Sequence, residues 1–128
     1  MITGGDGADR INGGEGRDRL TGGAGDDVFD FDGLIDSGAT VATADRITDF
    51  TSGDKIRLTM IDADTTLDGD QAFTFIGADA FSGTAGELRA TVINGNTMIT
   101  ADVDGDMAAD FGVLLLDVTD PSVITFVL

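Results

Sequence analysis

Apolar residues recur every nine positions near the start of the chain, at Ile11, Leu20 and Phe29, and each is followed by a polar or charged residue. This spacing is neither the period of about 3.6 residues of a helix nor the alternation of a long strand. It predicts a strand of about three residues at each apolar position, with that side chain pointing inward and its neighbours outward. Because so short a strand is not stable alone, we expect successive strands to coil into a parallel β-roll, with two nine-residue units in each full coil.

Each apolar position belongs to a nine-residue repeat that occurs three times without a gap, over residues 4–12, 13–21 and 22–30. Every copy reads Gly-Gly-x-Gly-x-Asp-x-U-x, where U is apolar. The glycines permit positive φ angles and let backbone carbonyls crowd around an ion. The sixth-position aspartates offer the anionic oxygen ligands that Ca²⁺ prefers. A flexible glycine linker is the alternative, but it does not explain an apolar residue in phase in every copy.

Stacked turns of such a roll are expected to share their calcium ions. Each repeat lies over the repeat two units later, about 4.8 Å away. We therefore expect Asp9 to pair with Asp27, supported by the carbonyls of Gly4, Asp6 and Gly22. The full ligand set predicted from the three repeats is Gly4, Asp6, Gly7, Asp9, Gly13, Glu15, Gly16, Asp18, Gly22, Gly23, Ala24, Gly25 and Asp27.

The nine-residue phase continues after the glycines stop. Counting on from Asp27 reaches Asp36, Asp45 and Asp54, and the matching eighth positions are Gly38, Ile47 and Ile56, of which the last two are apolar. This pattern predicts a decayed continuation of the roll as far as residue 58. In it, Asp36 and Asp45 are further ligand candidates, whereas Asp54 is better interpreted as a turn residue.

Longer strands separated by turn signals are predicted after residue 44. Asn94-Gly95 supplies the positive φ angles of a tight hairpin turn, and no segment has a helical period beyond one short turn at Met60–Asp64 and at Gly77–Phe81. We expect an antiparallel sheet that packs onto the end of the roll and hides its open edge. The expected core phenylalanines are Phe50, Phe73, Phe75, Phe81 and Phe111. The expected strands are Arg46–Phe50, Lys55–Met60, Ala72–Ile76, Glu87–Val92, Thr97–Asp102, Phe111–Asp117 and Val123–Leu128.

One acidic loop in this half is a weaker metal candidate. Its carboxylates stand at loop positions 1, 3, 5 and 9, a spacing similar to calcium loops. It departs from an EF-hand because its glycine is at position 4. A solvated acidic hairpin turn is therefore a slightly better interpretation. The four residues are Asp102, Asp104, Asp106 and Asp110.

Composition narrows the function. The net charge is −17, with 22 Asp but only 2 Glu among the acidic residues, and there are 19 glycines. Such a charge repels phosphate, so neither nucleic acid nor an anionic membrane is an expected partner. The chain has no His and no Cys, which removes the usual general base, thiol nucleophile and zinc ligands. We expect no catalysis and, since no apolar run approaches the length of a membrane span, no membrane insertion.

The nonapeptides resemble the RTX family of calcium-binding repeats. The rest of the chain is similar to the C-terminal β-roll domain of serralysin-type secreted metalloproteases. The similar blocks are Asp45–Phe50, Gly53–Leu58, Gly69–Gly77, Phe81–Arg89, and Asp102–Asp106 with Asp110-Phe111.

The resemblance implies an all-β domain over residues 1–128, with a calcium-binding parallel β-roll at 4–58 continued by an antiparallel β cap at 59–128. It further implies a non-catalytic module of a secreted, extracellular protein, with a passenger domain upstream. An uncleaved signal for the bacterial type I secretion apparatus would lie in the last residues, here Thr125–Leu128. The first residues show no secretory signal peptide, which agrees with a signal-peptide-independent route.

Three hypotheses of function follow. The first is a module that folds on Ca²⁺ binding outside the cell and assists the export of an upstream exoprotein. The alternative is an accessory polysaccharide-binding calcium module of an alginate-epimerase-like enzyme. The absence of Tyr and Trp and the scarcity of Arg disfavour binding to an anionic polysaccharide. A self-standing enzyme is the third hypothesis and has no catalytic set to support it.

Overall fold

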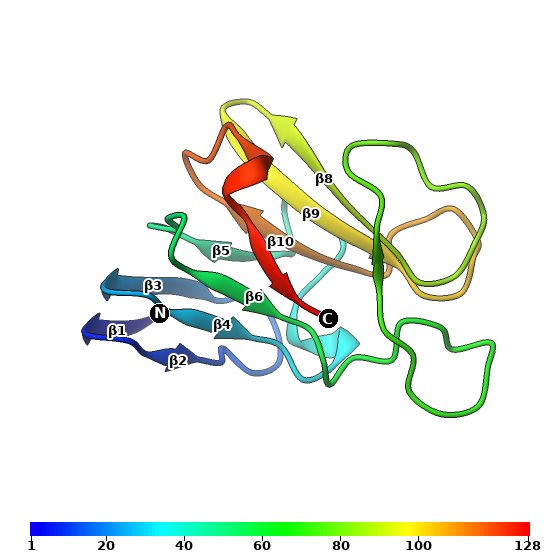
Figure 1. The fold of residues 1–128 in the computed structure, drawn as a ribbon, viewed down its shortest axis with the longest axis horizontal. Helices are drawn as coiled ribbons and strands as arrows, with labels where there is room; N and C mark the ends of the chain where they lie inside the picture. Colours follow the sequence, from blue (N-terminus) through cyan, green and yellow to red (C-terminus); the bar gives the residue numbers. More distant parts are fainter.

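Short parallel strands alternate between two sheets through the first half of the chain, as the computed structural model of residues 1–128 shows (Figure 1). All pairings among these strands are parallel. The predicted all-β fold with a parallel roll is therefore confirmed. A seven-stranded sheet contains β1 (Ile2–Asp6), β3 (Arg19–Ala24) and β5 (Asp45–Ile47), and a four-stranded sheet contains β2 (Arg10–Ile11), β4 (Val28–Asp30) and β6 (Lys55–Arg57).

The first two coils keep the register that the repeat predicts. Leu20 pairs with Ile2, and Phe29 pairs with Ile11, so each residue lies over the residue two nonapeptides earlier. Ile2 thus occupies the apolar position of a unit that precedes the first repeat, which the repeat pattern alone did not identify. The inward side chains of one coil stack on those of the next.

The third coil contains one nonapeptide more than the sequence predicted. Ile47 pairs with Leu20, and Ile56 pairs with Phe29, a separation of three units instead of two. Residues 31–44 form a loop that contains the 3₁₀ turn η1 (Leu34–Asp36) and no strand. The physical reason is Gly38, which has no apolar side chain to bury where the other units carry Ile, Leu or Phe. The continuation of the roll therefore holds at Asp45 and Asp54, but not at Asp36.

The second half extends both sheets of the roll instead of forming a separate layer. β10 (Phe111–Leu115) pairs parallel with β5 and antiparallel with β9 (Asn96–Asp102). β9 forms the expected hairpin with β8 (Glu87–Ile93), through Asn94 and Gly95 at φ of 50° and 79°. β7 (Thr74–Phe75) ends the seven-stranded sheet, and β11 (Thr125–Val127) pairs parallel with β6 in the four-stranded sheet. The open edge of the roll is thus covered by hydrogen-bonded strands.

Helical structure is confined to two short turns. η1 lies in the inserted loop, and η2 (Pro121–Val123) precedes β11. The segments 60–64 and 77–81, where one helical turn each was expected, contain none. No helix of the structure has the length and apolar character needed to cross a membrane.

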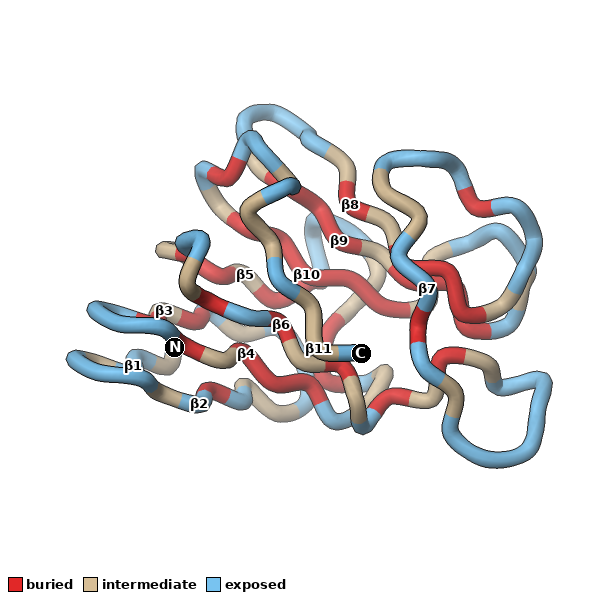
Figure 2. Tube along the Cα trace, in the orientation of Figure 1, coloured by how far each residue is buried: buried red, intermediate tan, exposed pale blue.

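One continuous core lies between the two sheets. Buried segments follow β4, β9 and β10 through the middle of the molecule (Figure 2). The rings of Phe31 and Phe111 meet edge to face with centroids 5.4 Å apart. Phe75 was expected in this core, but it is 42% exposed and its ring lies 5.0 Å from that of Phe126, because β7 is an edge strand. The other four expected phenylalanines are buried: Phe50, Phe73, Phe81 and Phe111.

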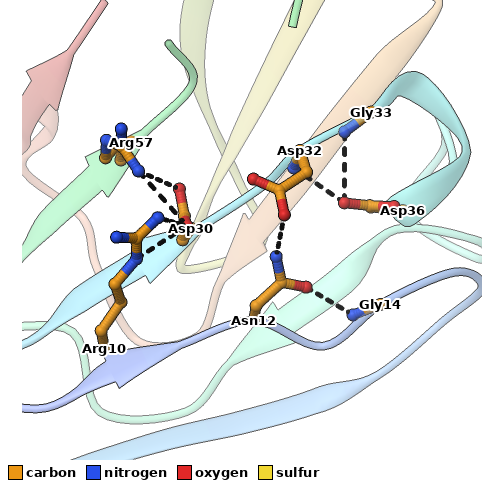
Figure 3. Close-up of polar contacts among 8 residues, drawn as sticks. All are labelled: Arg10, Asn12, Gly14, Asp30, Asp32, Gly33, Asp36 and Arg57. Carbon is orange, nitrogen blue, oxygen red and sulfur yellow. Dashed lines mark hydrogen bonds and ion pairs between the residues drawn. The ribbon is translucent and has the colours of Figure 1, made fainter. Parts of the chain in front are cut away.

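An ion-pair network ties the three coils together on the outer face of the four-stranded sheet (Figure 3). The side chain of Asp30 is only 3% exposed and accepts hydrogen bonds from Arg10 below it and Arg57 above it. The distances are 2.8 Å from Nε of Arg10 and 3.3 Å from Nη1 of Arg57. Beside it, Asn12 donates to Asp32 at 2.9 Å and accepts from the amide of Gly14 at 2.8 Å. These contacts join the coils without using the predicted metal ligands.

The core position shared by β3, β5 and β10 gives a stability test. Ile47 is fully buried between Leu20 and Leu115. We expect Ile47→Ala to lower the free energy of unfolding by about 2–5 kcal/mol, because it leaves a cavity that the sheets cannot close. Denaturant unfolding in saturating calcium measures this. The control Val92→Ala changes a side chain that is 48% exposed and should cost less than about 0.5 kcal/mol. Equal losses in both variants would contradict the described core.

Candidate metal centre

The turns of the roll form two stacks, one at each edge where the chain crosses between the sheets. The first stack contains the turns 4–9, 22–27 and 49–54, and the second contains the turn 13–18 and the end of the inserted loop before β5. Register therefore places the predicted ligands above one another. Asp9, Asp27 and Asp54 fall in the first stack, and Asp18 and Asp45 in the second.

Three of the sixth-position aspartates, Asp27, Asp45 and Asp54, bind the backbone of the coil before them. Oδ1 of Asp27 accepts from the amide of Asp9 at 2.9 Å, and Oδ1 of Asp54 accepts from the amide of Asp27 at 2.9 Å. In the second stack, Oδ1 of Asp45 accepts from the amide of Asp18 at 2.7 Å. The repeat predicted these side chains as metal ligands but not as links between coils. One carboxylate oxygen of each upper residue is therefore already used.

The second carboxylate oxygen is left without a partner at three of these positions. Oδ2 of Asp9, Oδ2 of Asp27 and Oδ2 of Asp45 are buried and make no hydrogen bond. An ionised oxygen removed from water without a partner carries a large free-energy cost. Asp54 differs, because its Oδ2 accepts from the amide of Thr51 at 2.8 Å, as suits a turn residue. The unpartnered oxygens mark where a cation would be stabilising.

Glycines leave the space into which these oxygens point. A Cβ atom on Gly4 would lie 2.7 Å from Oδ2 of Asp9 and 2.7 Å from the carbonyl oxygen of Gly22. A Cβ atom on Gly13 would lie 2.9 Å from Oδ2 of Asp18 and 3.2 Å from Oδ2 of Asp45. The first stack thus brings together a carboxylate and a carbonyl from successive coils, and the second brings together two carboxylates. Hard, anionic oxygen donors in this arrangement fit Ca²⁺.

The negative charge of Asp45 in the second stack is strongly disfavoured by its surroundings. The pKa of the Asp45 carboxyl is raised to about 7, chiefly by burial. The hydrogen bond from the amide of Asp18 lowers this pKa, whereas the carboxylates of Asp18 and Asp36 raise it. A cation among these groups would remove the repulsion that they share.

The structure places the other predicted ligands less uniformly. Asp6 and Glu15 are exposed, and the amide of Gly7 donates to the carbonyl of Ala24 at 2.6 Å, which holds the first two turns against each other. Asp36 lies in the inserted loop, where its Oδ2 accepts from the amides of Asp32 and Gly33 (Figure 3). Its two neighbours contact the second stack, since the amide of Gly16 donates to the carbonyl of Ile35 at 3.2 Å and the amide of Asp45 donates to Oγ of Ser37 at 2.7 Å. The role of Asp36 itself as a ligand stays a prediction.

One residue of the first stack was missed by the repeat analysis. Asp49 stands at the first position of its unit, where the repeat has glycine and predicts no ligand, yet its two carboxylate oxygens accept from the amides of Gly22 and Gly23, each at 2.8 Å. It stands where the third turn has lost the paired glycines of the first two. The available signal was an aspartate directly after the strand of a repeat that lacks glycine.

The acidic loop between β9 and β10 brings its four carboxylates together, with ligand oxygens within 4.8 Å of one another. Asp102 is fully buried, and its oxygens accept from the amides of Gly105 at 2.8 Å and Met107 at 2.9 Å. The hydrogen bond from the amide of Asp106 lowers the pKa of Asp104, but desolvation and the carboxylates of Asp110 and Asp106 outweigh it, so that this pKa is raised. Backbone amides donate to all four carboxylates, and none of their oxygens is both buried and unpartnered as in the roll, so this loop remains the weaker candidate.

A parallel roll with glycine-rich turns and stacked aspartates defines an RTX-type β-roll domain. Residues 2–124 match the family model described as Peptidase M10 serralysin C terminal, and the chain belongs to this family. The family's domain is a non-catalytic, calcium-binding RTX module of the peptidase. A comparison with curated proteins found no match to the chain.

The space beside Gly4 provides a test of the first stack. We expect Gly4→Ala to weaken calcium binding at one site by at least about tenfold, because the new methyl group would fill the space between Asp9 and the Gly22 carbonyl. Isothermal titration calorimetry measures this change as a smaller number of tightly bound calcium ions per chain. Neither Gly4 nor the control Gly33 has a positive φ, so backbone strain does not separate the two.

The control Gly33→Ala places its methyl group no closer than 3.9 Å to any heavy atom outside its neighbours. It should bind calcium as the wild type does. Unchanged stoichiometry and affinity in Gly4→Ala would show that the ions do not occupy this space.

Proposed function

We propose that this chain is a non-catalytic module that folds on Ca²⁺ binding outside the cell and carries a C-terminal type I secretion signal for an upstream exoprotein. The observation that carries the proposal is the set of buried, unpartnered carboxylate oxygens on Asp9, Asp27 and Asp45, which face glycine turns in two separate stacks. The match to a family of calcium-binding modules supports the same conclusion.

Two groups of residues would hold the ions. In the first stack these are Asp9, Asp27 and the Gly22 carbonyl, and in the second they are Asp18 and Asp45. When bound, Ca²⁺ supplies positive charge that neutralises the converging carboxylates. The carbonyls and carboxylates come from successive coils, so ligation joins one coil to the next. Binding free energy thereby becomes folding free energy of the roll.

The two halves of the chain depend on the ion to different degrees. The coils of the roll gain little core per residue and contain many glycines, which lose much backbone entropy on folding. The strands β8, β9 and β10 instead pair over five to seven residues, and apolar side chains such as Ile99 and Val113 are fully buried there. Where calcium is scarce, as inside a bacterial cell, we expect the roll to be unfolded and the chain to remain competent for export.

The position of the C-terminal strand agrees with export of the unfolded chain followed by folding of the roll in calcium. Thr125–Val127 pair in parallel with Lys55–Arg57, so the proposed secretion signal is part of the four-stranded sheet in the folded state. Because β6 belongs to the roll, its partner strand has a place to pair only after the third coil has formed. Folding outside the cell would withdraw the signal and oppose return.

Calcium removal gives the direct test of folding. In EGTA we expect the β-sheet signal of the roll to disappear from the circular dichroism spectrum and to return on addition of about millimolar Ca²⁺. Mg²⁺ at the same concentration is the control and should restore little, since it demands a smaller and more regular ligand shell. Equal β-sheet content in EGTA and in calcium would contradict calcium-dependent folding.

Export tests the secretion part separately. We expect the full chain, fused behind a reporter, to leave a bacterial host that expresses a type I exporter for a related exoprotein. Removal of residues 125–128 should abolish this export, whereas the exposed substitution Asp79→Asn should leave it unchanged. Export of the truncated chain at the level of the full chain would place the signal elsewhere.

A further inference from the structure

Asp49 contacts the second turn of the first stack from above. It follows β5 in the third coil, and register places it over Gly22. Its Oδ1 accepts from the amide of Gly22 and its Oδ2 from the amide of Gly23, both at 2.8 Å. Two successive backbone amides directed at one carboxylate form a small anion-binding concavity. The side chain thus fixes the orientation of both peptide groups.

One of these peptide groups also faces the candidate calcium site. The amide of Gly23 and the carbonyl of Gly22 belong to the same peptide unit, which is trans, so they point in opposite directions. Asp49 holds the amide on the upper side, and the carbonyl oxygen therefore points to the turn below. There it approaches the space beside Gly4, together with Oδ2 of Asp9.

This peptide lies in β3, where register pairs Gly23 with Gly5 of β1, and Asp49 adds a second hold from the coil above. Gly23 has a φ of 100°, and a Cβ atom there would collide with the carbonyl oxygen of Gly5. Glycine is therefore required, and glycine has the greatest backbone freedom of any residue. A carboxylate at the amide end removes that freedom and also polarises the peptide, which makes the carbonyl oxygen a better ligand.

We propose that Asp49 is a positioning residue for the calcium site of the first stack: it aims the Gly22 carbonyl at the site from outside the ligand set. The inference rests on the proposed calcium-binding function and adds to it a residue outside the repeat. The second stack has no contact of this kind from a later coil, because the amide of Gly14 is held by Asn12 of its own turn. The effect of Asp49 is therefore specific to the first stack.

Site-resolved calcium titration of the full chain tests the proposal. Two-dimensional ¹H–¹⁵N NMR follows the amides of Asp9 and Gly22 for the first stack and those of Gly13 and Asp18 for the second. For Asp49→Asn we expect the first-stack midpoint to rise by at least about tenfold and the second-stack midpoint by less than about twofold. The control Asp79→Asn removes the same charge from an exposed side chain outside both stacks and should titrate as the wild type does.

The conservative variant Asp49→Glu retains the carboxylate and should recover part of the lost affinity. If Asp49→Asn does not fold in saturating calcium, the comparison of the two stacks in Asp49→Glu decides the question. Equal shifts in both stacks, or no shift in the first, would overturn the positioning role while the wild-type titration still supports calcium binding. Wild-type signals of Asp9 and Gly22 that do not respond to calcium would overturn both the proposed function and the inference.

Discussion

Every feature of the roll depends on the bond between an aspartate of one coil and the amide of the equivalent aspartate in the coil before it. The bonds from the Asp9 amide to Asp27 and from the Asp18 amide to Asp45 fix the vertical alignment of the turns. They use one oxygen of each carboxylate and turn the other toward a glycine. The same side chain therefore aligns the coils and provides the charge that a cation must neutralise. Stacking and ligation cannot be separated in such a design.

The cap changes what the edge of the roll exposes. Unpaired parallel strands are a template for association with other chains. β10 and β11 cover the upper edge of the two sheets by pairing directly with β5 and β6. The core then continues from Leu20 and Ile47 into Leu115 without a break. Residues that need an ion and residues that need only apolar burial thus share one sheet.

The regular part of this structure was predictable from the sequence, and the irregular part was not. The period of nine fixes the inward positions of Leu20, Phe29, Ile47 and Ile56, because a β-roll has one apolar position per unit. The looped-out unit around Gly38 was not predicted, since Asp36 keeps the phase while the strand it would need has nothing to bury. Phe75 was expected in the core with the other phenylalanines of the second half, but exposure at a sheet edge depends on the order of strands. The contact of Asp49 with the turn below also depends on the longer third coil, which no local pattern shows.

Near-identical repeats raise a problem of alignment, and the pair of arginines around Asp30 addresses it. A coil displaced by a whole number of units would still place an apolar side chain inward and an aspartate in each turn. Among the ninth positions of the units that form coils, however, only Asp30 is acidic; the others are Thr3, Asn12, Thr21, Thr48 and Arg57. Arg10 and Arg57 meet this carboxylate together only when the second coil lies between the first and the third. The network thus distinguishes the native stacking order from shifted ones that core packing alone would accept.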